Sequence, residues 1–198
     1  MCIETIVLAS YNLNKVEEIQ KLLGNQFQVI PQQEFDIPPI EETGSTFQEN
    51  ALLKAKTVFD ITSLPVIGDD SGLEVAVLGN RPGVYSSRFS GADASDDDNI
   101  DKLLRKMQNI PSAKRTARFR CVVAFLGAIS LDQPVFFEGE WVGYIANERT
   151  GKNGFGYDPI FVDLQSKLTA AELNSDQKNK ISHRGKAIQS LKCYLATS

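Results

Sequence analysis

The stretch Leu64-Pro65-Val66-Ile67-Gly68-Asp69-Asp70-Ser71-Gly72 joins a short apolar run to two adjacent aspartates, and a second apolar run with Leu73 and Val75 follows. The first run is typical of a buried strand, and α/β folds place their sites at the carboxyl ends of such strands. Neighbouring like charges are costly in a compact fold unless a cation neutralises them. Two interpretations stay open for the aspartates. They form a hard-metal site that handles phosphate or water, or a polar turn, since Asp, Ser and Gly are common turn residues.

The composition is that of one ordinary globular chain. Its 198 residues suffice for a single domain, which we expect to span residues 1–198 without repeats or linkers. Apolar residues make up 42% and charged residues 23%, which argues against disorder. The formal net charge of −4 argues against a general nucleic-acid-binding protein, which needs a positive field.

The cysteines and the N-terminus indicate a cellular compartment. Cys2, Cys121 and Cys193 are far apart, and the chain has one histidine, so a zinc site or a disulfide framework is not expected. Free cysteines favour a reducing compartment. The first residues lack the basic start and apolar stretch of a signal peptide, and no window is long enough to span a bilayer. We therefore expect a cytoplasmic protein without membrane contact.

Apolar spacing predicts a mixture of strands and helices. Strands are expected over residues 5–9, 27–30, 118–128 and 134–145. The last two are expected to form an antiparallel pair joined near Asp132. Helices are expected to begin at the capping residues Asn14, Thr46, Ser95 and Ser182. The acidic triplet after Ser95 would place negative charge at the positive end of its helix dipole, which is the favourable arrangement.

Two segments could bind phosphate or metal. Ser10 to Lys15 lies between a strand and a helix, so the helix N-terminus with a hydroxyl, an amide and a lysine would make a phosphate cradle. The alternative is a capped surface helix with a solvated lysine. Glu41-Glu42 either supplies a metal ligand together with Asp69 or Asp70, or only favours the dipole of the next helix.

Two later segments could bind a planar base. Glycines on both sides of Phe155 would let its ring become exposed for stacking, although such aromatics also plug cores. His183 and Arg184 open the last helix, with Lys178 nearby in sequence. These donors would bind an anion or the carbonyl edge of a base, although a lone histidine is more often structural.

Six segments together carry a resemblance to a known family. They are Ser10-x-Asn12-x-x-Lys15, Glu41-Glu42-Thr43-Gly44-x-Thr46-Phe47-x-Glu49-Asn50-Ala51, Asp69-Asp70-Ser71-Gly72-Leu73, Pro82-Gly83-x-Tyr85-Ser86-x-Arg88, Gly154-Phe155-Gly156-Tyr157-Asp158-Pro159 and Ser182-His183-Arg184. Single short motifs are often false, but their occurrence in this order is specific. The chain resembles the inosine triphosphate pyrophosphatase family, the non-canonical purine nucleoside triphosphate pyrophosphatases, nearly end to end.

The resemblance implies a fold and an activity. The implied fold is α/β, elongated and two-lobed, with a long mixed twisted sheet flanked by helices and a central nucleotide cleft. The implied protein is a homodimer. The implied reaction is the magnesium-dependent hydrolysis of ITP, dITP or XTP to the monophosphate and pyrophosphate, which removes these nucleotides from the pool.

The resemblance also implies roles for individual residues. Asp70 would be the general base, and Glu42 and Asp70, with help from Asp69, would hold Mg²⁺. The residues beside the phosphates and metal would be Ser10, Asn12, Lys15, Lys54 and Ser71. The base and ribose pocket would be formed by Phe155, Gly156, Tyr157, Asp158, Lys178, His183 and Arg184. Tyr11 and Asn153 stand where the family often has glycine, which leaves substrate preference and rate open.

Three other functions are compatible with the same residues. A nucleotide-binding regulator would keep the pocket without turnover, and pyrophosphate release in the presence of magnesium separates it from an enzyme. A related pyrophosphatase for canonical or modified pyrimidine triphosphates would differ in relative kcat/KM across a nucleotide panel. A structural interaction module would show no thermal shift with any triphosphate. The carboxylates and lysines favour catalysis over all three.

Overall fold

The computed structural model describes residues 4–127 and 133–197. Within them, a mixed sheet has the strand order β2-β1-β3-β5-β6-β7, and β4 pairs with β3 beside this path. β1 runs parallel to β2 and β3, whereas β4 and β7 run antiparallel to β3 and β6. The strands are β1 (Glu4–Leu8), β2 (Phe27–Pro31), β3 (Val66–Val75), β4 (Arg81–Pro82), β5 (Thr116–Leu126), β6 (Val135–Ile145) and β7 (Phe161–Asp163).

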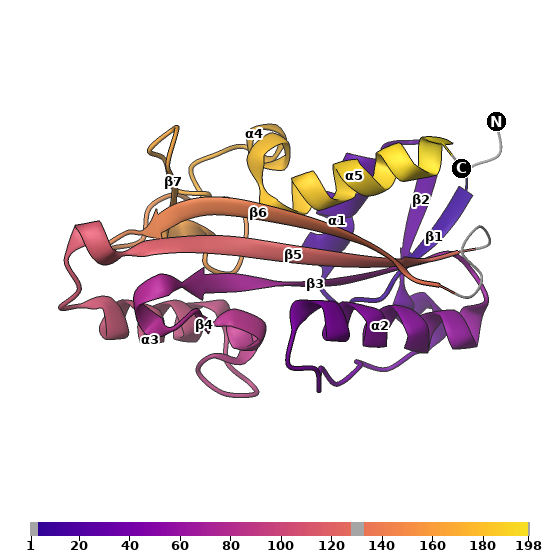
Figure 1. Ribbon diagram of the computed structural model, residues 1–198, viewed down its shortest axis with the longest axis horizontal. Helices are drawn as coiled ribbons and strands as arrows, with labels where there is room; N and C mark the ends of the chain where they lie inside the picture. The colour runs from indigo at the N-terminus through magenta and orange to yellow at the C-terminus, as the bar shows by residue number, and fades with distance from the viewer. Residues whose placement is uncertain (1–3, 128–132, 198) are drawn as a thin grey trace. The chain divides into compact units, whose positions relative to one another are not determined.

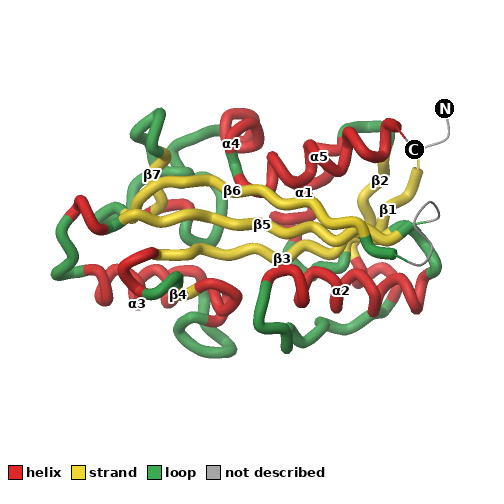
Figure 2. The backbone as a smooth tube through the Cα atoms, in the orientation of Figure 1, coloured by secondary structure: helices red, strands yellow, loops and turns green. Residues whose placement is uncertain are grey.

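Helices flank this sheet, which confirms the expected α/β class (Figures 1 and 2). The α-helices are α1 (Leu13–Leu23), α2 (Phe47–Thr62), α3 (Asp96–Met107), α4 (Ser175–Ile181) and α5 (His183–Thr197). No helix among the described residues has both the length and the apolar character needed to cross a membrane.

Residue contacts divide the chain into two compact units. The first unit comprises Met1–Asp70, Cys121–Gly139 and Arg184–Ser198. The second unit comprises Ser71–Arg120 and Glu140–His183. Each unit combines segments that are far apart in sequence and has its own buried apolar cluster. The single domain expected over residues 1–198 stays a prediction.

In the first unit, helices cover both faces of the strands. Side chains of α1 and α5 join β1, β3 and β5 in one buried cluster, to which the helices contribute Ile19, Leu23, Ala187, Ile188 and Leu191. α2 lies on the opposite side of the strands from α5 (Figure 1). Gly68 of β3 allows α2 to approach closely, because a Cβ at this position would lie 2.1 Å from the carbonyl oxygen of Ala51. That contact requires glycine at position 68.

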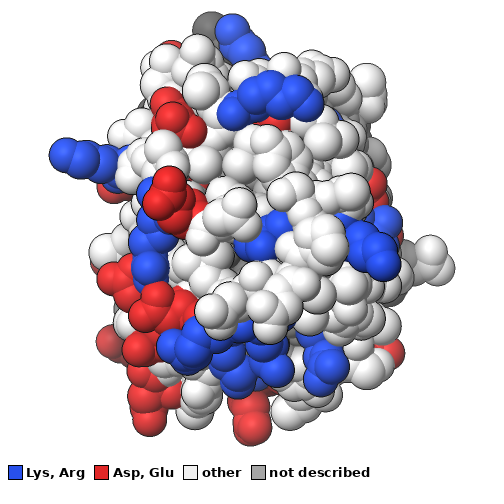
Figure 3. All heavy atoms as spheres, turned by 90° about the vertical axis from the view of Figure 1, so that its left-hand side faces the viewer, with Lys and Arg blue, Asp and Glu red and all other residues white. Residues whose placement is uncertain are grey.

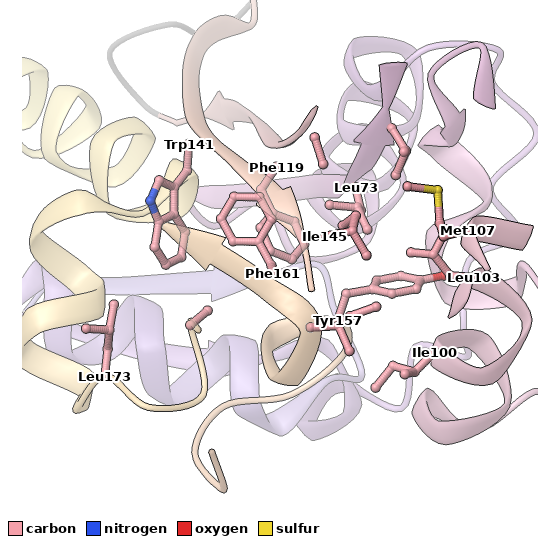
Figure 4. Packing of buried hydrophobic residues seen from close by; sticks show 14 residues of the cluster. Leu73, Ile100, Leu103, Met107, Phe119, Trp141, Ile145, Tyr157, Phe161 and Leu173 are labelled. Atoms are coloured by element: carbon pink, nitrogen blue, oxygen red, sulfur yellow. The ribbon is translucent and has the colours of Figure 1, made fainter. Parts of the chain in front are cut away.

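In the second unit, aromatic rings from three strands form the centre of the core (Figure 4). The ring centroids of Phe119 and Phe161 are 4.6 Å apart, and Trp141 meets Phe161 edge-on at 5.0 Å. The indole nitrogen of Trp141 donates a hydrogen bond of 2.8 Å to Asp163 Oδ1. α3 closes this core with Ile100 and other apolar side chains. The cluster thereby joins β5, β6, β7 and α3 in the core of this unit.

Most of the expected elements form with slightly shifted bounds. The strands expected over residues 5–9, 27–30, 118–128 and 134–145 correspond to β1, β2, β5 and β6. β5 and β6 are neighbours in the sheet, and their expected link near Asp132 lies outside the described residues. Thr46 and Ser95 each close a capping box at the start of α2 and α3, as expected.

Two local expectations are wrong. Asn14 does not cap α1, because the helix already begins at Leu13 and Asn12 Oδ1 accepts hydrogen bonds from the N–H groups of Asn14 and Lys15. The strand expected to end before Asp69 instead continues as β3 to Val75. Sequence reasoning also misses α4 and β7, which are 7 and 3 residues long and too short for a clear periodic pattern.

Candidate active site

Asp69 and Asp70 lie inside β3 rather than in a turn after it, so the polar-turn interpretation is wrong. They are 0% and 3% exposed, respectively. Leu8, the last residue of β1, pairs with Ile67 of β3, so both aspartates lie just beyond the carboxyl end of the neighbouring parallel strand. The expected position of the site, at the carboxyl end of a strand, is therefore met with respect to β1. Two buried carboxylates in this position need compensating positive charge.

The loop after β1 brings a first positive charge to the aspartates. Ser10 Oγ accepts a hydrogen bond of 3.1 Å from the N–H of Asn12, which in turn caps α1. Lys15, in the first turn of α1, forms an ion pair with Asp69 Oδ1, and its side chain is 15% exposed. The alternative of a solvated lysine on a surface helix is therefore wrong. The helix dipole and Lys15 together make this end of α1 electropositive.

A second positive charge reaches Asp69 from α5. Arg184 Nε donates a 3.2 Å hydrogen bond to Asp69 Oδ2, and Arg184 Nη1 donates one of 2.5 Å to Glu18 Oε2. The thiol of Cys121 donates to the same Asp69 oxygen at 3.0 Å. Burial alone would raise the pKa of Asp69, but Arg184 and Lys15 lower it well below its ordinary value. Asp69 is therefore a stable carboxylate that connects β3 to α1 and α5.

Lys54 of α2 connects two further carboxylates. Its ammonium donates to Glu42 Oε1 at 2.7 Å and to the backbone carbonyl of Asp69 at 2.6 Å, and it lies 3.4 Å from Asp70 Oδ1. Asn50 Nδ2 donates a 3.0 Å hydrogen bond to Asp70 Oδ2. Sequence reasoning gives Asn50 no role, although its spacing of four residues from Lys54 places both on one helix face. Both carboxylate oxygens of Asp70 thus have a neighbour on α2.

The surroundings of Asp70 and Asp69 shift their pKa values in opposite directions. Burial raises the pKa of Asp70; Lys54 opposes this shift, whereas the carboxylate of Glu42 adds to it. For Lys54, burial lowers the pKa, but Asp70 and Glu42 outweigh burial and raise it above the ordinary value. Asp70 is therefore the more easily protonated aspartate of the pair, while Lys54 stays positively charged.

The acidic side chains near Lys54 offer two carboxylates to a Mg²⁺ ion, those of Glu42 and Asp70. No group of three or more His, Cys, Asp or Glu side chains in the described residues could hold a metal ion by itself. Glu42 and Asp70 nevertheless both lie beside the Lys54 ammonium, at 2.7 and 3.4 Å, so two negative charges are close together there. Mg²⁺ prefers oxygen ligands and often takes only one or two carboxylates, with water and substrate phosphates completing its shell. The residues present therefore fit a magnesium ion shared with a triphosphate.

In the second unit, the glycine-rich loop (residues 151–157) is built around a buried ion pair. Lys178 Nζ of α4 lies 2.6 Å from Asp158 Oδ2, with side-chain exposures of 6% and 3%. The same ammonium lies 4.9 Å from the centroid of the Phe155 ring, and the N–H of Phe155 donates to Asp158 Oδ2 at 3.0 Å. Gly154 has a φ of +76°, and a Cβ there would lie 2.0 Å from that carboxylate oxygen. The loop therefore needs glycine at this position.

Two other residues expected in the base pocket are packed in the second unit. The Tyr157 hydroxyl donates a 2.9 Å hydrogen bond to the backbone carbonyl of Ser86, and its ring belongs to the core in Figure 4. His183 stacks on Phe119, with ring centroids 4.7 Å apart and an interplanar angle of 11°. Both side chains are 5% exposed. Their rings thus support the loop and the start of α5.

The expected site residues fall into two groups. Those in the first unit are Ser10, Asn12, Lys15, Glu42, Lys54, Asp69, Asp70 and Arg184. Those in the second unit are Ser71, Phe155, Gly156, Tyr157, Asp158, Lys178 and His183. The resemblance implies that Arg184 binds the base, and the structure assigns it to the first unit and pairs it with Asp69 and Glu18.

The second unit also has a surface hollow of about 880 Å³ beside α3. Its charged lining residues are Asp93, Asp98, Asp101, Lys102, Arg105 and Lys106. Acidic and basic groups are balanced there, and the expected site residues do not line it. On the face of the molecule in Figure 3, basic and acidic side chains are likewise interspersed rather than forming one continuous basic surface.

Comparison with known proteins places these features in a family. The fold is similar to a HAM1 protein from Coxiella burnetii, with a TM-score of 0.88, 46% identity, and coverage of 98% of this chain and 100% of that one. It is also similar to the Ham1 protein of Staphylococcus aureus, with a TM-score of 0.86, 42% identity, and coverage of 98% and 99%.

The sequence comparisons agree with the structural ones. A protein from Methylococcus capsulatus, named dITP/XTP pyrophosphatase, is 49% identical over 183 residues, which cover 92% of this chain and 91% of that protein. A dITP/XTP pyrophosphatase from Coxiella burnetii is 48% identical, with 96% of each chain covered. A sequence model of the Ham1 family matches residues 6–194. The chain belongs to the Ham1 family.

Proposed function

We propose that this protein hydrolyses non-canonical purine nucleoside triphosphates (ITP, dITP and XTP) to the monophosphate and pyrophosphate, and that the reaction requires Mg²⁺. Relatives nearly half identical over almost the whole chain carry the name dITP/XTP pyrophosphatase, which supports the substrate class. The observation that carries the chemistry is the convergence of Glu42 and Asp70 on Lys54. That arrangement supplies carboxylates for a metal and an ammonium for phosphate at one place.

Asp70 is the proposed general base of this reaction. Its raised pKa makes it a better proton acceptor than an ordinary aspartate. Asn50 holds Asp70 Oδ2 at 3.0 Å and so orients the carboxylate. Glu42 and Asp70 would hold Mg²⁺, while Asp69, already paired with Lys15 and Arg184, would support them by its charge. When bound, the metal would offset the charge of the phosphates and acidify a water molecule.

Positive groups of the first unit are proposed to bind the phosphates. Lys15 and the N-terminus of α1 adjoin Asp69, and Lys54 adjoins Asp70. Ser10 and Asn12 shape the loop that leads into this helix end. In phosphoryl transfer, such groups act by positioning and by stabilising the charge of the leaving pyrophosphate. Ser71, which follows Asp70 in β3, is proposed to supply a further hydroxyl to the phosphates.

Residues of the second unit are proposed to bind the purine. The Phe155 ring would stack on the base, with Gly156, Tyr157 and Asp158 shaping the loop. A 6-oxo purine accepts a hydrogen bond where adenine donates one, so donors such as His183, Lys178 or backbone N–H groups would favour inosine and xanthosine. A donor left unsatisfied by adenine would cost roughly 1–3 kcal/mol.

Pyrophosphate release from ITP, XTP, GTP and ATP, measured with and without Mg²⁺, tests this proposal. We expect turnover of ITP and XTP to exceed that of ATP and to stop when the metal is chelated. Failure to hydrolyse ITP with ample Mg²⁺, or orthophosphate as the first product, would contradict it. We further propose a cytoplasmic homodimer, which light scattering and fractionation of cells would test.

A further inference from the structure

A hydrogen bond connects the first turn of α3 to the glycine-rich loop. Asp96 Oδ2 accepts from the N–H of Gly156 at 2.7 Å, although the two residues are 60 positions apart. Both residues belong to the second unit. A charged acceptor makes this a stronger hydrogen bond than a neutral one would be. The bond fixes part of the loop that carries Phe155.

The three aspartates that begin α3 have different partners. Asp98 closes the capping box, with its Oδ2 accepting from Ser95 Oγ at 2.6 Å and from Ser95 N–H at 2.9 Å. Asp97 lies 3.3 Å from Arg149 Nη2. Asp96 instead accepts from the loop. A general preference for acids at a helix N-terminus does not account for this third contact.

Asp96 and Asp158 hold consecutive N–H groups of the loop. The N–H of Phe155 donates to Asp158 at 3.0 Å, and the N–H of Gly156 donates to Asp96 at 2.7 Å. Gly156 has a φ of +60°, so the chain turns sharply directly after Phe155. Tyr157, the next residue, is anchored in the core. The backbone on both sides of the Phe155 ring is thereby fixed.

The electrostatics agree with this proximity. Burial raises the pKa of Tyr157, and the negative charge of Asp96 raises it further. Lys178 contacts the Phe155 ring, and its positive charge is balanced by the carboxylate of Asp158. Asp96 is exposed, and its partner Gly156 is half-buried. The hydrogen bond between them can therefore be removed without opening the core.

We propose that Asp96 is a positioning residue for purine binding: by holding the N–H of Gly156 it fixes the loop that presents the Phe155 ring to the base. This inference rests on the proposed function. Loss of the bond leaves the carboxylates and lysines of the first unit in place, because these lie on other elements. It should therefore weaken binding of the base without slowing the chemical step.

The first test compares Asp96→Ala with Asp97→Ala, which removes the neighbouring acid of the same helix turn. We expect KM for ITP to rise roughly five- to ten-fold in Asp96→Ala, the size of the net contribution of one ordinary hydrogen bond, because Asp96 is exposed to solvent. The kcat should stay within about two-fold of the parent value, on the same reasoning. Asp97→Ala should keep the KM of the parent. Equal KM values in the two variants, or a loss confined to kcat, would overturn the assignment.

The second test asks whether Asp96 acts through Phe155. Asp96→Ala is combined with Phe155→Ala in a double-mutant cycle. If Asp96 positions the ring, its removal should raise KM no further once the ring is absent. Additive effects on KM would show that Asp96 acts elsewhere. Inhibition constants add a matched readout: Asp96→Ala should weaken inhibition by inosine and leave inhibition by pyrophosphate unchanged.

A conservative variant guards against loss of folding. Asp96→Asn keeps an acceptor oxygen and loses only the charge, so its KM should lie between those of the parent and of Asp96→Ala. If Asp96→Ala does not fold, the same cycle is run with Asp96→Asn, and a KM equal to that of the parent then rejects the role. Absence of ITP turnover in the parent protein would reject the proposed function, and this inference with it. Normal parent turnover with unchanged variants would reject only the inference.

Discussion

Arg184 Nε lies 3.2 Å from Asp69 Oδ2, and both side chains are almost fully buried. Arg184 at the start of α5 also reaches Glu18 on α1, at 2.5 Å. One guanidinium thus joins β3, α5 and α1, which are distant in sequence. Buried charges of this kind are strongly coupled, because either partner alone would be left uncompensated.

Removal of Arg184 should therefore destabilise the fold. We expect Arg184→Met to lower the free energy of unfolding by roughly 3–5 kcal/mol, the range found when one partner of a buried ion pair is lost. Denaturant unfolding measures this change. Arg118→Met is the matched control, since Arg118 is 39% exposed and pairs with Glu74. That variant should lose less than about 1 kcal/mol, and equal losses in both would contradict the structural role of Arg184.

Asp69 should make stability depend on acid pH. Its pKa is lowered well below the ordinary value in the folded chain, whereas in the unfolded chain the same carboxyl group has a pKa of about 3.9. Between these two pKa values the unfolded state binds a proton that the folded state does not. The contribution of Asp69 to the free energy of unfolding is therefore complete above the pKa of the unfolded state. It is lost as the pH falls from there toward the lower pKa of the folded state. Denaturant unfolding of the parent and of Asp69→Asn at a series of pH values from 7 downward measures this contribution. The difference in stability should be constant near neutrality and shrink below about pH 4.

The periodic elements were predictable because they depend on local signals. The capping boxes at Thr46 and Ser95 mark α2 and α3 within a few residues of sequence. β5 and β6 are long enough for apolar patterns to appear. Asn12 and Asn14 are equivalent as capping residues by type, so only the backbone geometry distinguishes them.

The partners of the charged residues were not predictable in the same way. The sequence motif indicated Asp69 and Asp70 as one pair of site residues, but their surroundings differ. Arg184 lies beside Asp69, and Asn50 lies beside Asp70. The contact between Asp96 and the loop likewise joins distant segments. Such differences arise from tertiary contacts, which a single sequence does not encode in any local pattern.

Replacement of Asp70 separates catalysis from stability. Asp70→Asn keeps the shape and the acceptor toward Asn50 but cannot take a proton, so kcat should fall by roughly 10²–10⁴-fold. The pKa of Asp70 is raised in the folded chain, which means that burial of the charged form opposes folding at neutral pH. The variant should therefore be at least as stable as the parent in denaturant unfolding. Asp60→Asn, on the exposed side of α2, serves as the control. Near-normal turnover in Asp70→Asn would remove Asp70 from the role of base.

Replacement of Phe155 should affect binding more than chemistry. The ring lies beside the buried pair of Lys178 and Asp158, so the loop can keep its backbone bonds when the ring is lost. We expect Phe155→Ala to raise KM for ITP roughly ten-fold, as loss of one base stack predicts. The kcat should fall less than KM rises, since no reacting group is removed. Phe155→Tyr retains a ring and should stay close to the parent in steady-state kinetics. A fall in kcat at unchanged KM would argue that Phe155 supports the loop and does not stack on the purine.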